Sequence, residues 1–255
     1  MYDLEQAINE RHSTRMFLRD KAVPPELIQE ALTLAMRAPS NSNIQPWQLV
    51  LATGPGRDRL VEALLEVAAV ESPAVPVLPE SFAHMRRDLG ALVYGSMGIP
   101  RHDADARRIA VLRNWEFFRA PVAGIVCMHR DLDYVDALGV GMFIHTLLLA
   151  LTARGLGTCV QVSIAGYPEV VREQLEISDE MRILCGLAIG YPTRASPAMQ
   201  YTCRAIPSSP TWSSSTADLG ERAALDVERL RRAERDRHLF QAADEVGRTK
   251  RQVRV

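Results

Sequence analysis

Two polar clusters near the N-terminus carry the residue types that bind a charged, flat ligand. The first is the basic run 11–15, in which Ser13 lies between two arginines. Paired arginines hold a phosphate through charge-assisted hydrogen bonds, and a serine hydroxyl adds a third donor. The second is the polar run 39–45, whose Asn43 and Gln45 each present a donor and an acceptor without adding charge. The pair suits a ligand with an anionic end and a flat hydrogen-bonding end, as flavin mononucleotide (FMN) has.

Each cluster taken alone also has an ordinary structural interpretation. An Arg-x-Ser-x-Arg run is short enough to occur by chance at the solvated end of a helix. An amide-rich run before a strand is typical of a turn, because Asn and Ser side chains bond their own backbone. The two clusters together, one helix-length segment apart, favour the binding interpretation over these alternatives.

Proline positions and apolar spacing predict the elements that must place these clusters. Pro24 and Pro25 followed by an acid predict a helix start, and Ala38-Pro39 ends that helix because the residue before proline avoids the helical region. Apolar spacing predicts further helices near residues 4–8 and over 57–70, 82–96, 103–118, 134–154 and 168–175. Strands are predicted over 47–52, 122–128, 158–162 and 182–189.

Two predicted elements are apolar on all sides. Residues 122–128 form a continuous apolar run, which indicates a central strand buried on both faces. The helix over 134–154 is apolar nearly all round from residue 140 to residue 153, and such a helix is buried in a large core or against a partner chain. Gly155-Leu156-Gly157 is expected to end it.

An aromatic group lies at the end of the helix predicted over 103–118. Trp115, Phe117 and Phe118 are close together there. Aromatic side chains dominate protein cores, so a core position is one interpretation. The other interpretation is a lid or pocket wall.

Bulk composition excludes several classes of protein. The 255 residues carry a net charge of −1, which argues against a nucleic-acid or membrane-surface role for the whole chain. The N-terminus lacks the basic and apolar regions of a signal peptide, and the apolar run 140–153 is too short to span a bilayer. The four cysteines show no Cys-x-x-Cys spacing and are expected to be reduced thiols of a cytoplasmic protein, with no disulfide frame and no metal site.

The character of the chain changes after residue 193. Residues 193–217 are rich in Ser, Pro and Thr and are expected to form an extended arm. Residues 218–255 mix acidic and basic side chains with a weak apolar stripe, which indicates a solvated helix or a disordered tail. A nucleic-acid contact through this tail is the alternative, although its acids dilute the positive charge.

Five motifs, in order along the chain, resemble those of the FMN-dependent nitroreductase family. They are Arg11-x-Ser13-x-Arg15, Ala38-Pro39-Ser40-x-x-Asn43-x-Gln45-Pro46-Trp47, Asn114-x-x-Phe117-Phe118-x-Ala120-Pro121, Gly155-Leu156-Gly157-Thr158 and Cys185-Gly186-x-x-Ile189-Gly190-Tyr191-Pro192. The resemblance runs from about residue 4 to residue 204. The serine-rich run and the charged tail depart from the family pattern.

The resemblance implies an α+β fold, with a mostly antiparallel central sheet flanked by helices, in an intertwined homodimer that binds FMN at its interface. It implies a domain over 1–204, with an arm and tail over 205–255. The residues that it implies for FMN binding are Arg11, His12, Ser13, Arg15, Pro39, Ser40, Asn41, Asn43, Gln45, Ser163, Ile164, Ala165 and Arg204. The residues expected to line the acceptor pocket are Tyr94, Trp115 and Phe118.

The function implied by the resemblance is a ping-pong oxidoreductase. NADPH or NADH gives a hydride to the flavin, and a nitroaromatic, a quinone or a similar electron-poor acceptor then takes its place. The flavin carries the chemistry, so no catalytic side chain and no metal are expected. Two alternatives remain: a specialised flavin or enone reductase on the same fold, and a regulatory or storage protein that binds FMN without turnover. The sequence does not choose between NADH and NADPH or name the acceptor.

Overall fold

The computed structural model describes residues 3–193, apart from the side chain of Ser96. The predicted arm, the charged tail and Arg204 lie outside the described residues. The elements in chain order are α1 (Leu4–Glu10), α2 (Pro25–Ala35), η1 (Asn41–Asn43), β1 (Trp47–Thr53), α3 (Gly54–Val70), η2 (Glu80–Phe82), α4 (Ala83–Ser96), α5 (Ala104–Leu112), η3 (Phe117–Arg119), β2 (Val122–His129), α6 (Tyr134–Thr152), β3 (Gly157–Gln161), η4 (Val162–Gly166), α7 (Pro168–Leu175) and β4 (Met181–Gly190).

The four strands form one sheet in the order β1-β2-β4-β3, and every neighbouring pair is antiparallel. This confirms the predicted fold class and all four predicted strands. Every residue of β2 except His129 is buried, as expected for a central strand. The register between β2 and β4 shifts at Val126 and Cys127, which marks a bulge or irregularity in this central pair.

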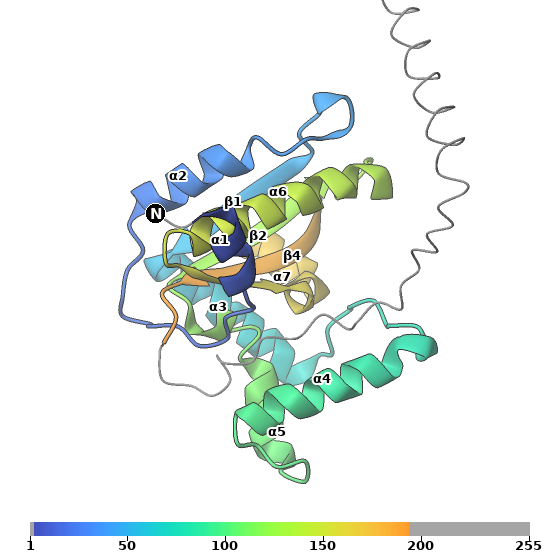
Figure 1. Ribbon diagram of the computed structural model, residues 1–255. Coiled ribbons are helices and arrows are strands. Elements are labelled where there is room, and N and C mark those ends of the chain that lie inside the picture. Colours follow the sequence, from blue (N-terminus) through green and yellow to red (C-terminus); the bar gives the residue numbers. More distant parts are fainter. Residues whose placement is uncertain (1–2, 194–255) are drawn as a thin grey trace, which may run out of the picture. The chain divides into compact units, whose positions relative to one another are not determined.

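Helices cover both faces of the sheet (Figure 1). On one face, α2 and α6 pack against Val122 and Leu187. On the other face, α3 and α7 pack against Ala123 and Ile125. Successive residues of a strand point to opposite faces, so an unbroken apolar run feeds both cores at once. Each large aliphatic side chain buried in this way contributes about 1.5–3 kcal/mol relative to its exposed state.

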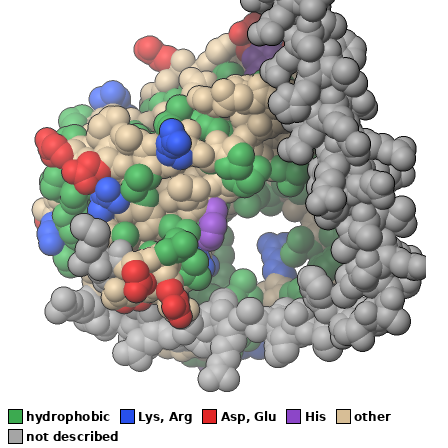
Figure 2. Space-filling view, turned by 45° about the horizontal axis from the view of Figure 1, so that its top comes forward, with side chains coloured by type: hydrophobic (Ala, Val, Ile, Leu, Met, Phe, Trp, Pro, Cys, Tyr) green, Lys and Arg blue, Asp and Glu red, His purple; other side chains and the backbone are tan. Residues whose placement is uncertain are grey.

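The helix α6 is the longest element of the domain. A capping box between Asp133 and Asp136 begins it, and Gly155, with φ of +73°, follows its end. Its outer side carries the exposed apolar side chains Val135, Leu138 and Met142, of which Leu138 is 65% exposed. Figure 2 shows other apolar side chains interspersed with charged ones on one face of the molecule. The buried side of α6 and its exposed stripe together explain why the sequence shows no polar face.

By length and composition, α6 could cross a membrane, with a mean hydropathy of 1.7 over its apolar window. The expectation that the apolar run is too short concerns residues 140–153 alone, whereas the whole helix has 19 residues. In the structure, Phe143, Leu147 and Leu151 of α6 are buried in the core beside α2 and the sheet. That is the position of a core helix.

The helix predicted over 103–118 ends early. Asp103 caps α5 as expected, by accepting a hydrogen bond from the N–H of Ala106, but the helix ends at Leu112. Phe117, Phe118 and Arg119 follow with φ of +51°, +51° and +65°. Such left-handed backbone is rare for bulky residues, and apolar periodicity gives no sign of it.

The helices α4 and α5 extend away from the sheet (Figure 1). None of their described side chains is buried. The beginning of the segment that leads to α4 is nevertheless bonded to residues at and next to η4. The hydroxyl of Tyr167 donates to the carbonyl of Glu71, and the N–H of Ala74 donates to the carbonyl of Gly166, over 2.7 and 3.0 Å.

Candidate functional site

The basic cluster lies along the edge strand β3. The N–H of Thr14 donates to the carbonyl of Thr158 over 2.8 Å, and Ser13 forms an isolated parallel bridge with Thr158. Arg11 and Arg15 are half-buried, and neither guanidinium forms an ion pair with any residue in the part of the chain that the structure describes. Two unpaired guanidinium groups beside a serine form a donor set that fits a phosphate.

The thiol of Cys159 lies beside this cluster. Burial raises the pKa of Cys159 to about 11, and the positive charge of Arg15 and a hydrogen bond with Ser13 only partly oppose the effect. Burial likewise raises the pKa values of Cys127 and Cys185, to about 11 and about 12. Because a thiolate is the reactive form of cysteine, these three thiols are inert structural groups at neutral pH.

The imidazole of His12 contacts the backbone of the N-terminal segment. Its Nδ1 lies 2.8 Å from the carbonyl of Glu10, and its Nε2 is buried with no partner among residues 3–193. His12 and Thr14 line a pocket of about 140 Å³ at the C-terminal end of α6. A contact of His12 with the phosphate, through its ring or its backbone, stays a prediction.

The amide-rich run 39–45 is an exposed, strained loop between α2 and β1. Ser42, Asn43 and Gln45 have φ values of +50°, +56° and +48°. The Ser40 hydroxyl accepts from the N–H of Gln45 over 3.0 Å, and the Gln45 amide donates to Asn43 Oδ1 over 3.3 Å. Strained backbone of this kind persists where the surroundings hold it, and it concentrates at binding sites. The remaining amide groups of the loop face outward, toward any ligand that covers it.

The two clusters lie at opposite ends of α6 within one protomer. The amide loop is at the N-terminal end, where Asn41 Nδ2 donates to Asp136 Oδ1 over 3.4 Å. The basic cluster is at the other end, where Thr14 and Thr152 line one small pocket. At 1.5 Å per residue, the helix places these two ends about 24 Å apart. A single protomer therefore does not bring the clusters together, although only one helix separates them in sequence.

The turn η4 continues directly from β3 and contains the other predicted contacts. Ser163 and Ala165 are half-buried, whereas Ile164 is fully buried, so the contact expected for Ile164 stays a prediction. At 3.3 Å per strand residue, η4 begins about 13 Å along the chain from Thr158, the anchor of the basic cluster. The basic cluster and η4 thus lie along one strand, at a spacing that suits one extended ligand.

The expected acceptor-pocket residues do not share one environment. Trp115 and Phe118 are each 5% exposed and belong to the core beside α3 and α7. This burial favours the core interpretation of the two rings, and their role in stacking on an acceptor stays an untested prediction. Tyr94 lies on α4, with the guanidinium carbon of Arg107 4.5 Å from its ring centroid. A role for Tyr94 in the acceptor pocket stays a prediction.

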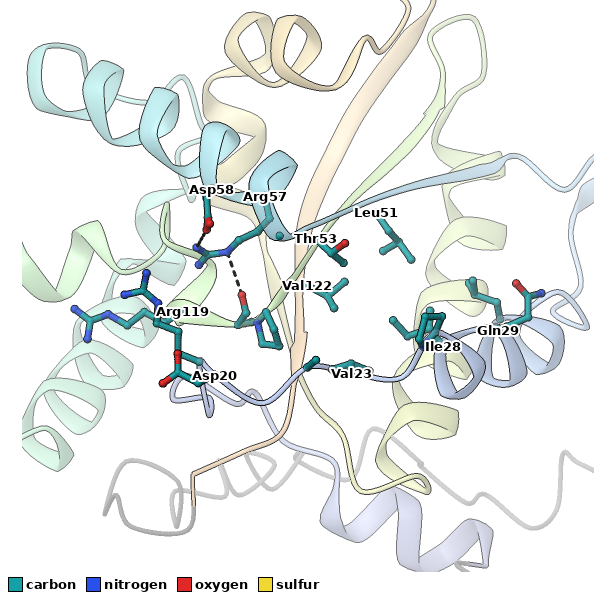
Figure 3. A pocket seen from close by; sticks show the side chains of 17 residues that line it. Asp20, Val23, Ile28, Gln29, Leu51, Thr53, Arg57, Asp58, Arg119 and Val122 are labelled. Atoms are coloured by element: carbon teal, nitrogen blue, oxygen red, sulfur yellow. Dashed lines mark hydrogen bonds and ion pairs between the residues drawn. The ribbon is translucent and has the colours of Figure 1, made fainter.

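An open pocket of about 930 Å³ lies elsewhere, between α2, the end of β1 and the start of β2. None of the predicted site residues lines it. Arg57 lies at one end of it and is bonded to Asp58 and to the carbonyl of Ala120 (Figure 3). We do not assign the flavin to this pocket, because the residues that suit a phosphate and an isoalloxazine ring lie elsewhere.

Sequence patterns missed two buried polar residues that organise the site. Arg57 is 8% exposed and binds backbone carbonyls of the loop 114–120, although the surrounding sequence resembles an ordinary helix start. Gln161 is 3% exposed and donates to the carbonyl of Asn114 over 2.7 Å. For Gln161 the only local signal is a polar residue at the end of the strand β3, and Arg57 in the first turn of α3 has none.

Comparison with known proteins agrees with this geometry. The model of the nitroreductase family matches residues 8–191. The chain is 34% identical to a nitrobenzene nitroreductase from Ectopseudomonas oleovorans, over 77% of this chain and 90% of that one. It is 36% identical to a 4-nitrobenzoate reductase from Pseudomonas putida, over 74% and 85% of the two chains.

A solved structure shares the fold. It is the FMN-dependent nitroreductase NfnB from Mycobacterium smegmatis in complex with NADPH, which superposes with a TM-score of 0.73 at 29% identity, over 80% of this chain and 96% of that one. The family match covers the basic cluster, the amide loop, β3 and η4 in a single span. This chain therefore belongs to the nitroreductase family.

Proposed function

We propose that this protein is an FMN-dependent NAD(P)H oxidoreductase that reduces nitroaromatics and similar electron-poor acceptors. The observation that carries the proposal is the course of β3. This strand joins the unpaired arginines 11 and 15, through the contact between Thr14 and Thr158, to the turn η4. The names of the relatives, which reduce nitrobenzene and 4-nitrobenzoate, support the choice of acceptor.

The residues of this chain bind and orient the cofactor. Arg11, Arg15 and the Ser13 hydroxyl would hold the phosphate, and the backbone of η4 would bind the polar edge of the ring. When bound, FMN supplies the redox chemistry by taking two electrons from the nicotinamide and passing them to the acceptor. The overall reaction for a nitroaromatic is ArNO₂ + NAD(P)H + H⁺ → ArNO + NAD(P)⁺ + H₂O.

The site is completed by a second copy of the chain. The amide loop 39–45 lies about 24 Å along α6 from its own arginines, so it serves the flavin held by the partner's basic cluster. The apolar stripe of Val135, Leu138 and Met142 on α6 supports a homodimer, because an exposed apolar row of this kind is buried in most stable proteins. A cytoplasmic location and the absence of nucleic-acid and membrane partners stay predictions of the sequence.

Anaerobic reduction of the purified protein tests the function. We expect a yellow protein whose visible flavin absorbance is bleached by NADPH or NADH and restored by 4-nitrobenzoate. Colour without bleaching would contradict turnover and favour an FMN-binding regulatory protein. Bleaching that only free flavin or an enone reverses would favour a specialised reductase on the same fold.

A further inference from the structure

Two adjacent residues of the loop 114–120 hold the turn η4 at both ends. Gln161, which immediately precedes η4, donates from Nε2 to the carbonyl of Asn114 over 2.7 Å. Tyr167, which immediately follows η4, packs its ring against Trp115, with the ring centroids 5.8 Å apart and tilted by 50°. One dipeptide therefore fixes both ends of a five-residue turn.

The middle of η4 is fixed from the opposite side. Ile164 is fully buried and packs over Gly186 of β4 so closely that a Cβ on this glycine would lie 2.5 Å from Ile164 Cγ1. The last residue of the turn, Gly166, accepts a hydrogen bond at its carbonyl from the N–H of Ala74 over 3.0 Å. The turn therefore cannot slide along β4 without breaking a contact on each side.

The loop that holds η4 is itself held by contacts with α3. Its residues 117–119 have left-handed φ values, which bulky side chains adopt only where the surroundings impose them. The buried guanidinium of Arg57 donates to the carbonyls of Glu116 and Ala120 over 2.8 and 3.2 Å. Asn114 and Trp115 therefore belong to a fixed frame, and η4 is held against that frame.

The residue types at the contact are unusual for a core. Gln161 Oε1 and Trp115 Nε1 are both buried without a hydrogen-bond partner among the described residues. An unpaired buried polar atom is unfavourable, and an aliphatic side chain of the same volume would avoid it. An aliphatic residue at position 161, however, could not donate a hydrogen bond to the carbonyl of Asn114.

We propose that Gln161 and Trp115 are positioning residues for the flavin: by fixing both ends of η4, they set the position of the backbone that lies beside the ring. The inference rests on the proposed function, because η4 matters to the chemistry only with FMN bound. Both side chains lie inside the protomer, so they act through the turn rather than by touching the flavin. A backbone donor held near the ring alters the relative stability of its oxidised and reduced forms.

The first measurement uses the protein without FMN. Gln161→Met keeps the volume and removes the donor, whereas Ile28→Val on α2 removes one methyl group from the opposite face of the sheet. Hydrogen–deuterium exchange should rise in the peptide that spans η4 for Gln161→Met and stay unchanged there for Ile28→Val. Should Gln161→Met not fold, Gln161→Asn shortens the amide so that it no longer reaches Asn114, and the same result is expected.

The second measurement uses the FMN-loaded protein. We expect Gln161→Met to change the ratio of affinities for oxidised and reduced FMN about tenfold, which shifts the two-electron midpoint potential by about 30 mV. Trp115→Phe, which keeps a ring against Tyr167, should shift it less, and Ile28→Val should leave it unchanged.

The outcomes separate this inference from the proposed function. A wild-type protein that binds no FMN would contradict the function, and the positioning role with it. FMN binding together with unchanged exchange in Gln161→Met would overturn the positioning role alone. Increased exchange with an unchanged potential would also overturn it, because η4 would then be loosened without consequence for the flavin.

Discussion

The backbone N–H of Thr14 donates a hydrogen bond to the carbonyl of Thr158 over 2.8 Å, and this contact attaches the basic cluster to β3. Arg11 and Arg15 thereby lie at one end of a strand whose other end continues into η4. This contact is what positions the basic cluster, because α1, which precedes the cluster, is short and mostly exposed.

Loss of both arginines should yield a protein that no longer retains FMN. A hydrogen bond to a charged group contributes about 1.5–3 kcal/mol, so Arg11→Ala with Arg15→Ala should weaken FMN binding by roughly 100-fold or more. Fluorescence titration of the apo-protein measures the Kd. Arg59→Ala, which removes an exposed arginine of α3 outside the basic cluster, is the control and should leave the Kd unchanged. Stoichiometric FMN in the double variant would contradict the phosphate assignment.

Gly157 should be required for the same attachment. A Cβ at this position would lie 2.5 Å from Thr14 Oγ1 and 2.9 Å from Thr14 Cγ2. Gly157→Ala should therefore destabilise the protein by about 1–3 kcal/mol, as overpacking does, and weaken FMN binding. Thermal denaturation and FMN titration measure the two effects.

Two further variants make the test of Gly157 specific. Adding Thr14→Ala to Gly157→Ala should restore part of the stability, because it removes the two closest atoms. Gly95→Ala on α4, where a Cβ meets nothing within 4 Å, should be neutral or stabilising by up to about 1 kcal/mol. Equal destabilisation by Gly95→Ala and Gly157→Ala would argue against a specific contact.

Much of the fold was predictable because its signals are local. Proline at the start of α2, the Asp103 cap of α5 and the unbroken apolar run of β2 each act through neighbouring residues, and each prediction is confirmed. The strand predicted over 158–162 likewise corresponds to β3, although the turn η4 that follows it was not predicted.

The rest depends on tertiary contacts that periodicity does not report. The left-handed residues 117–119 exist because Arg57, sixty residues away in sequence, holds the carbonyls on either side of them. The burial of Trp115 and Phe118, and the separation of the two clusters along α6, arise from packing in the same way. The roles of Arg204 and of the tail lie outside the described residues.

Removal of Arg57 should destabilise the protein strongly. Arg57→Ala leaves the carbonyls of Glu116 and Ala120 without their donor and opens a cavity, so a loss of about 3 kcal/mol is expected. Asp58→Ala is the matched control, because it removes only the ion pair with an exposed carboxylate, which contributes about 0–1 kcal/mol. Urea denaturation compares the two, and equal losses would show that the carbonyl contacts contribute nothing.

A charge on the apolar stripe of α6 should separate the protomers. Leu138→Lys places a cation in a surface that the homodimer would bury, at a cost of several kcal/mol. Light scattering should report a monomer, and FMN should be lost because the loop 39–45 of the partner is lost. Val70→Lys, at an exposed apolar position on α3, should remain dimeric and yellow. A monomeric Leu138→Lys protein with full FMN content would contradict the shared site.

Heterodimers of two defective chains test the shared site most directly. One chain carries Arg11→Ala with Arg15→Ala, and the other carries Asn43→Ala with Gln45→Ala. Neither homodimer should retain FMN. If each site combines the basic cluster of one protomer with the amide loop of its partner, the heterodimer contains one site with every defect and one intact site. FMN titration of the purified heterodimer should then give one flavin per dimer at wild-type affinity. A heterodimer that binds no FMN would contradict the composite site, because each protomer would then be using its own loop.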